Sequence, residues 1–272
     1  NMTAVGSCAL FTNSTGTGNT AVGYFANKLN TTGTDNTSVG REALEANTTA
    51  SGNTAVGYQS LTLNTTGGSN TALGQLAMCA STEGEANTAV GRLALAKNTT
   101  ADNNTAVGAQ SLRCVTTNGD NTAVGTLALN KSTASNSTAV GACALRCNTT
   151  GTDNTAMGAC ALNLNSSGAY NSAFGYRSLD SSTSASSNTA VGFHSMCKTT
   201  TGANNTAVGF CSLQANTTGA SNVAVGYNSM LTNTEGANNV AMGVLALEMN
   251  TTGDGNTAIG REALEANQTA DN

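Results

Sequence analysis

The fold is decided by a stretch of 17 residues, NTAVGYQSLTLNTTGGS, at residues 53–69. Near copies fill the chain of 272 residues in steps of 17, except for one step of 16 between Asn121 and Ser137, which the leading Asn1 balances. Self-similarity at a fixed period is typical of repeat architectures, so we expect a single continuous repeat domain over residues 1–272, without terminal caps. Its sixteen copies begin at Met2, Asn19, Asn36, Asn53, Asn70, Asn87, Asn104, Asn121, Ser137, Asn154, Asn171, Asn188, Asn205, Asn222, Asn239 and Asn256.

Each copy follows the pattern N-T-A-V-G-x-x-A-L-x-x-N-T-T-G-x-x, whose positions we number 1 to 17. Position 5 is Gly in all sixteen copies, position 3 is Ala in all but Ser38, and position 9 is Leu or Met in all but Asn27. The T-A-V segment favours a strand, whereas the Gly and the N-T-T-G segment favour turns. The repeat therefore predicts an all-β fold, a parallel β-solenoid (β-roll) of sixteen 17-residue coils with two short strands per coil.

The alternation of side chains along the T-A-V strand leaves two interpretations open. Neighbouring residues of a strand point to opposite faces, so an inward Val at position 4 would place the Ala at position 3 outside. The Ala row, from Ala4 to Ala258, varies less than position 6, which holds Tyr24 and Arg41. Either this row packs closely against a partner chain or a neighbouring layer, or Ala is simply small enough for a tight coil.

The composition argues against several classes of function. The 15 acidic and 10 basic residues give a net charge of −5 and form no basic run, so we expect no nucleic-acid partner. No apolar run approaches the length of a membrane span, so we expect no membrane insertion. With 9% charged residues and one His, the chain has few groups for acid–base chemistry. Eight Cys favour an oxidising compartment.

The NTAVG string followed by a second turn of small residues resembles the head repeats of YadA-type trimeric autotransporter adhesins. In those heads a motif of the NSVAIG kind recurs once per coil of a left-handed parallel β-roll. The string is also similar to repeats of some phage and viral tail-fibre proteins. The period differs, because the unit here is longer by an N-T-T-G turn. The resemblance implies a left-handed coil, a trimer, and an adhesive or structural module outside the cell or on a virion surface, without catalysis.

The residues offer no convincing catalytic, cofactor or metal site. His194 is the only His, and no Ser or Cys stands beside it with an orienting acid, so we expect an exposed surface His and no enzyme. Gly67 and Gly68 lack the flanking pattern of a phosphate-binding loop. Asp residues near the final turn are too sporadic for a repeated calcium site: Asp35, Asp120, Asp153 and Asp254. We therefore expect no cofactor.

The cysteines suggest cross-links between coils. Cys143 and Cys160 occupy position 7 of adjacent copies, so their Cα atoms should lie within the range that a disulfide allows. Cys197 and Cys211 also fall in adjacent copies, at different positions, and form a weaker candidate pair. Free thiols are the alternative. Cysteines without a neighbour at the same position could make contacts between chains: Cys8, Cys79, Cys114 and Cys147.

Asn-x-Ser/Thr triplets at position 12 are candidate sites for glycosylation. The alternative is that these Asn and Thr residues serve turns and side-chain ladders. Sugars on the Thr residues of the N-T-T turn are also open. The ten candidate residues are Asn13, Asn30, Asn47, Asn64, Asn98, Asn148, Asn165, Asn216, Asn250 and Asn267.

Three functions stay in view. The leading expectation is an extracellular structural protein that forms, or belongs to, a filament or fibre shaft by end-to-end stacking of coils, with itself as the main partner, head to tail and laterally. The alternative is an adhesin or tail-fibre receptor-binding module, trimeric, with a cell-surface or glycan ligand. A third is ice binding through the Thr row at position 2, from Thr3 to Thr257. Against it, this Thr shares strand parity with the Val taken as inward.

Overall fold

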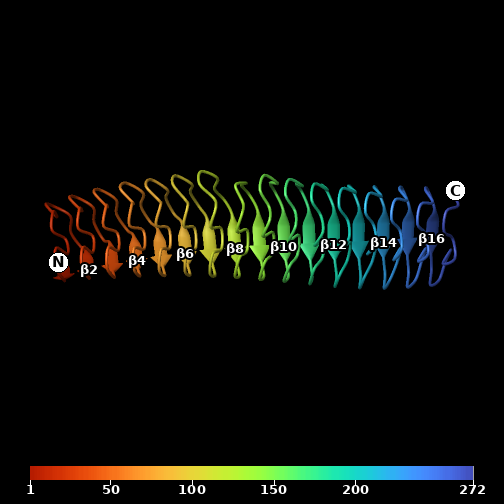
Figure 1. The fold of residues 1–272 in the computed structure, drawn as a ribbon, viewed down its shortest axis with the longest axis horizontal. Helices are drawn as coiled ribbons and strands as arrows, with labels where there is room; N and C mark the ends of the chain where they lie inside the picture. Colours follow the sequence, from red (N-terminus) through yellow and green to blue (C-terminus); the bar gives the residue numbers. More distant parts are fainter. Residues whose placement is uncertain (272) are drawn as a thin grey trace. The chain divides into compact units, whose positions relative to one another are not determined.

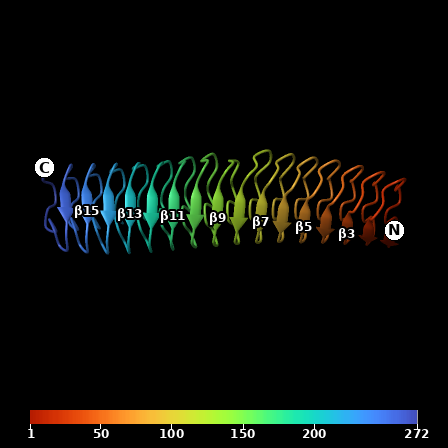
Figure 2. The same cartoon turned by 180° about the vertical axis from the view of Figure 1, so that it is seen from behind.

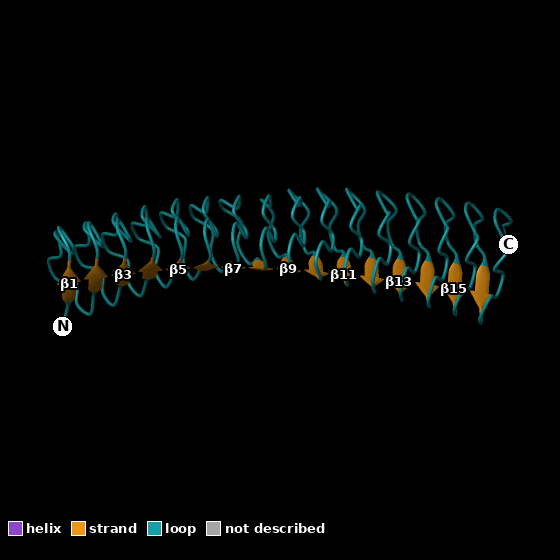
Figure 3. Ribbon diagram, turned by 60° about the horizontal axis from the view of Figure 1, so that its bottom comes forward, coloured by secondary structure: helices purple, strands orange, loops and turns teal. Residues whose placement is uncertain are grey.

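The computed structural model describes residues 1–271, which fold into short parallel strands and turns without a helix (Figures 1 and 3). The chain divides into two compact units, Asn1–Asn136 and Ser137–Asn272. The boundary between them coincides with the single 16-residue step of the sequence. Each unit is a stack of coils, and the fold class expected from the repeat is confirmed as a parallel β-solenoid.

Each coil contributes one strand of three residues, formed by positions 2 to 4, and strands of successive coils pair in parallel and in register. Thr54 pairs with Thr71, Ala55 with Ala72 and Val56 with Leu73. Figures 1 and 2 show the strands of each unit following one another in chain order. The first unit holds β1 (Thr3–Val5), β2 (Thr20–Val22), β3 (Thr37–Val39), β4 (Thr54–Val56), β5 (Thr71–Leu73), β6 (Thr88–Val90), β7 (Thr105–Val107) and β8 (Thr122–Val124). The second unit holds β9 (Thr138–Val140), β10 (Thr155–Met157), β11 (Ser172–Phe174), β12 (Thr189–Val191), β13 (Thr206–Val208), β14 (Val223–Val225), β15 (Val240–Met242) and β16 (Thr257–Ile259).

The prediction of a second strand in each coil is wrong. Positions 7 and 9 adopt left-handed backbone conformations, as at Gln59 (φ 51°) and Leu61 (φ 50°), and a strand does not contain such residues. This segment still bonds to its neighbours, because Gln59 donates to the carbonyl of Arg41 at 3.0 Å and Leu61 to that of Ala77 at 2.9 Å. The coil is therefore closed by hydrogen-bonded turns opposite a single sheet, as Figure 3 shows within each unit.

The orientation assumed for the strand residues is also wrong. Ala55 is fully buried, whereas Thr54 and Val56 on either side of it are only partly buried. The interior is occupied by the side chain of position 9, such as the fully buried Leu61, which leaves room only for a small side chain at position 3, Ala or the buried Ser38. Ala is thus the small inward residue of a tight coil, buried by its own chain, as at Ala55. Val at position 4 faces outward.

The Gly at position 5 turns the chain out of the strand at a point where its backbone lies close against the next coil. Gly91 has φ +134°, a conformation that side chains rarely adopt. A Cβ atom on it would lie 2.6 Å from the carbonyl oxygen of Gly108 in the next coil. The positive φ recurs at position 5 of all sixteen copies, and the close contact recurs in most of them, which explains why this position is Gly.

Two ladders of Asn side chains run through the interior, from positions 1 and 12. Asn53 accepts a hydrogen bond from the backbone N–H of Asn70 (2.9 Å) and donates from Nδ2 to the carbonyl of Gly67 (3.0 Å). Asn64 donates to the same carbonyl at 2.8 Å, and Asn47 donates to Asn30 Oδ1 at 2.8 Å. These amides satisfy backbone groups that the tight coil buries away from water.

The hydrogen bonds locate the residue missing from the shortened copy. Asn104 Nδ2 reaches the carbonyl of Asn118, 14 residues further on, as elsewhere in the stack. In the next coil Asn121 Nδ2 donates to Ala134, only 13 residues further on, at 2.9 Å. Ser132 still bonds back to Leu129 in the usual way. The deletion therefore lies between Ser132 and Ala134, in the N-T-T turn.

Candidate functional surfaces

The outer face of the strands carries two uncharged rows, Thr at position 2 and an apolar residue at position 4. Both point outward because the Ala between them points inward. In β14 and β15 the Thr is replaced by Val223 and Val240, so that both rows are apolar there. Half-exposed apolar side chains of this face include Val191, Val208 and Met242. The strands of each unit thus present a regular surface of methyl groups and hydroxyl groups.

A second surface follows the corner after the strands, where position 6 of four successive coils is aromatic. We call the set Tyr176, Phe193, Phe210 and Tyr227 the corner strip. Neighbouring ring centroids lie 5.4, 5.2 and 5.4 Å apart, with interplanar angles of 20°, 6° and 10°. The in-register stack of coils brings these side chains together, so residues that look scattered in the sequence form one continuous surface.

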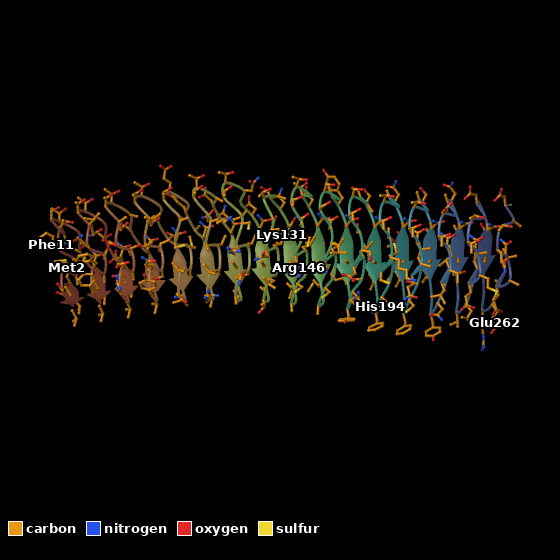
Figure 4. The ribbon with its side chains drawn as sticks, viewed as in Figure 1. Met2, Phe11, Lys131, Arg146, His194 and Glu262 are labelled. Atoms are coloured by element: carbon orange, nitrogen blue, oxygen red, sulfur yellow. The ribbon has the colours of Figure 1, made fainter. Side chains whose placement is uncertain are left out.

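His194 belongs to this corner and is not the exposed surface residue that the sequence suggested. Its ring is partly buried and stacks on Phe193, with centroids 4.1 Å apart and planes 2° apart, beyond the ends of the strands (Figure 4). Within the described chain its Nε2 atom is buried without a hydrogen-bond partner. Burial lowers the pKa of His194, the nearby Arg177 guanidinium lowers it further, and Asp180 opposes the shift. The neutral imidazole is therefore the form that this environment favours.

Arg177 and Asp180 lie beside the corner strip. Arg177 donates from Nε to Asp180 Oδ2 at 2.8 Å, and its Nη2 lies 2.8 Å from the same oxygen. The bond to the carboxylate raises the pKa of Arg177, so the guanidinium stays charged. The Asp180 side chain is largely buried, whereas that of Arg177 is about half exposed at 47%. The pair therefore holds an accessible guanidinium at a fixed place next to the rings.

The cysteines of both predicted pairs are free thiols in the structure. Burial raises the pKa of Cys160, and the thiol of Cys143 adds to the shift. The backbone N–H of Cys160 donates to the carbonyl of Ala142 at 2.9 Å, so Cys143 and Cys160 lie on hydrogen-bonded segments of adjacent coils. Burial likewise raises the pKa of Cys211, and the thiol of Cys197 raises it further. All eight cysteines are free in the structure, and the two disulfides stay predictions.

Most of the candidate glycosylation residues are buried. A sugar on Nδ2 would have to occupy the inside of the coil, where this atom already donates hydrogen bonds, as Asn47 does to Asn30 and Ala50. The ladder interpretation of these Asn residues fits the structure, because their amides are already hydrogen-bonded inside the coil. Glycosylation of these residues stays a prediction. Only Asn13 and Asn267 are partly exposed; the fully buried ones are Asn30, Asn47, Asn64, Asn98, Asn148, Asn165, Asn216 and Asn250.

Over residues 1–271 the structure contains no pocket and no group of three or more His, Cys, Asp or Glu side chains placed to hold a metal ion. In the same range no helix has the length and hydrophobicity needed to cross a bilayer. No protein-family model matches the chain, and no curated protein matches it.

Proposed function

We propose that the chain is a structural element of an extracellular fibre or filament, in which coil stacks on coil. The observation that carries the proposal is the equivalence of the interfaces between coils. In the first unit Thr54 donates to the carbonyl of Asn70 at 2.8 Å. In the second unit Thr189 makes the same bond to Asn205 at 2.9 Å. An edge built this way can pair with any other coil of the same kind.

The bonds run in both directions across each interface, which supports stacking without a special cap. Gly74 donates back to the carbonyl of Val56 at 2.8 Å while Leu61 donates forward to that of Ala77 at 2.9 Å. Both edges of a coil therefore present donors and acceptors in a fixed register. Such stacking can continue within a longer chain or between chains, and both give a shaft. The extracellular location in this proposal comes from the resemblance to surface adhesins.

Electron microscopy of the purified 272-residue chain over a range of protein concentrations tests the proposal. Stacking predicts filaments whose length grows with concentration, and fibre diffraction from them should show the rung spacing of about 4.8 Å. Discrete trimeric particles at all concentrations would contradict stacking between chains and favour the adhesin or tail-fibre alternative.

Ice binding is a second candidate, favoured by the outward Thr row. Thr88 and Thr105 do not point inward with Val, as the strand parity suggested, but lie on the outer face next to Val90 and Val107. Regularly spaced hydroxyl and methyl groups on an uncharged face could order water. Thermal hysteresis of the protein tests this candidate, with Thr88→Lys and Thr105→Lys expected to reduce it. Absence of hysteresis in the unmodified protein would exclude this function.

A further inference from the structure

The corner strip has more exposed aromatic surface than a closed stack of rings would have. Near-parallel rings in full face-to-face contact would lie about 3.5 Å apart. The centroids of Phe193 and Phe210 are 5.2 Å apart with planes only 6° from parallel. For ring planes in van der Waals contact, this centroid distance corresponds to a sideways displacement of roughly 4 Å, like overlapping tiles. Part of each face stays uncovered, in agreement with exposed fractions of 43–50% for the four side chains.

The strip repeats along the stack with a single period. Its ring spacings of 5.4, 5.2 and 5.4 Å present one partly uncovered aromatic face per coil over four coils. A ligand that uses all four faces must be linear, and it must place one flat apolar patch at each of these steps.

The spacing of the rings distinguishes between the classes of linear polymer that could bind the strip. An extended peptide places side chains of one face about 6.6–6.8 Å apart, which falls out of step with the rings. Single-stranded nucleic acid can stack on aromatic rings, yet it needs a positively charged groove, and this chain has a net charge of −5. An extended β-1,4-linked glycan advances by about one ring spacing per sugar and carries flat patches of C–H groups. That polymer fits the strip.

The surroundings of the strip supply hydrogen-bonding groups suited to sugar hydroxyls. Arg177 presents its half-exposed guanidinium beside the rings, held by Asp180. The first and last rings, Tyr176 and Tyr227, carry hydroxyl groups that can both donate and accept. The aromatic faces can pack against the C–H groups of a pyranose, and the polar groups at their margin can bond its hydroxyl groups.

We propose that the corner strip of the second unit binds an extended β-1,4-linked glycan, with one sugar lying over each of Tyr176, Phe193, Phe210 and Tyr227. Glucan and N-acetylglucosamine chains share this backbone, and the experiment distinguishes them. The proposal is independent of the fibre role, because it needs only the second unit and its outer corner.

Isothermal titration calorimetry of the full chain with cellohexaose and with chitohexaose tests the proposal. We expect at least one of the two hexasaccharides to bind, and maltohexaose, whose α-links curve the chain, to bind more weakly. Replacing a central ring by Phe210→Ala should weaken binding on the order of tenfold, as loss of a central aromatic contact does.

Tyr58→Ala is the matched control, because Tyr58 occupies the same repeat position with similar exposure but has no aromatic residue at position 6 of the adjacent coils. We expect it to leave binding unchanged. Circular dichroism and thermal melting of both variants confirm that each is folded, and Phe210→Leu replaces Phe210→Ala if the latter unfolds. Absence of binding by both β-1,4-linked hexasaccharides would overturn the proposal. So would equal losses for Phe210→Ala and Tyr58→Ala.

Discussion

The side-chain amides of Asn53 and Asn64 donate to the same backbone carbonyl, that of Gly67, at 3.0 and 2.8 Å. One carbonyl thus ties together the start of a coil and the turn that ends it. Repeated from coil to coil, this arrangement makes the interior partly polar, with paired amides taking the place of a larger apolar core. The stability of the stack should therefore depend on whether each ladder is continuous.

Ser81→Asn should stabilise the protein by repairing a break in the position 12 ladder. The hydroxyl of Ser81 and the Oδ1 atom of Asn64 in the preceding coil are both buried without a partner. An Asn at this position could donate to Asn64 Oδ1 and to the carbonyl of Gly84, as Asn47 does in its own coil. We expect a gain of about 1 kcal/mol in the free energy of unfolding, measured by urea denaturation.

Ser81→Ala serves as the control for this substitution. It removes the unpartnered hydroxyl without adding an amide, so we expect little change in stability. If Ser81→Asn proved no more stable than Ser81→Ala, the ladder would not contribute as described.

Asn27→Leu should also stabilise the protein. Asn27 stands at position 9, where other coils bury Leu or Met, and both polar atoms of its side chain are buried without a partner. Leu44 in the next coil accepts the same left-handed conformation (φ 55°), so the backbone strain is tolerated. We expect a net gain of about 1–2 kcal/mol from removing the unpaired amide. Asn233→Leu, which breaks hydrogen bonds to Asn216 and Gly236, should instead destabilise the protein. Thermal melts of the two variants measure both effects.

Gly91→Ala should destabilise the stack by more than about 2 kcal/mol, because it combines backbone strain with a clash against the next coil. Gly260 has a similar φ of +123°, yet a Cβ atom there would meet nothing within 4 Å. Gly260→Ala therefore carries the strain without the clash. Comparing the two by chemical denaturation isolates the effect of coil stacking, and equal losses would show that the close approach at Gly91 has no energetic weight.

His194 should make stability fall as the solution is acidified below neutral pH. Because its pKa is lowered in the folded protein, the unfolded state binds a proton first as the pH falls through the ordinary value for His. The free energy of unfolding should decrease from about pH 8 to about pH 5.5, above the range in which most carboxylates titrate. In His194→Gln this part of the pH dependence should disappear. An unchanged profile would mean that His194 is free to protonate in the folded state.

The sequence was sufficient to predict the solenoid, because the 17-residue period repeats without a gap of unrelated residues. It was insufficient for the direction of the strand side chains. Size suggested that Val fills the interior, whereas Leu61 from the opposite side of the coil already does so, and only Ala55 fits beside it. Nothing in the residue pattern indicates that a Leu adopts a left-handed conformation, which strands and helices avoid.

The candidate surfaces were only partly foreseeable. Phe193 and Phe210 both occupy position 6 of adjacent copies, so their contact could have been deduced from the register alone. The burial of Asn64 could not be deduced from the sequence, because Asn-Thr-Thr is equally typical of an exposed turn and of an interior ladder. Its partner at Gly67 becomes evident only once the coil is closed.

Deletion of one complete coil tests the central claim, that coils are equivalent rungs joined by the same bonds. Removing residues 53–69 places the coil that begins at Asn70 directly on the coil that begins at Asn36, with every position in register. We expect this variant to keep a cooperative thermal transition, with the free energy of unfolding reduced by no more than the share of a single coil. Removing residues 53–61 instead shifts the register of the joined coils and should abolish the transition. If the whole-coil deletion were as damaging as the partial one, the coils would not be equivalent, and the account would be contradicted.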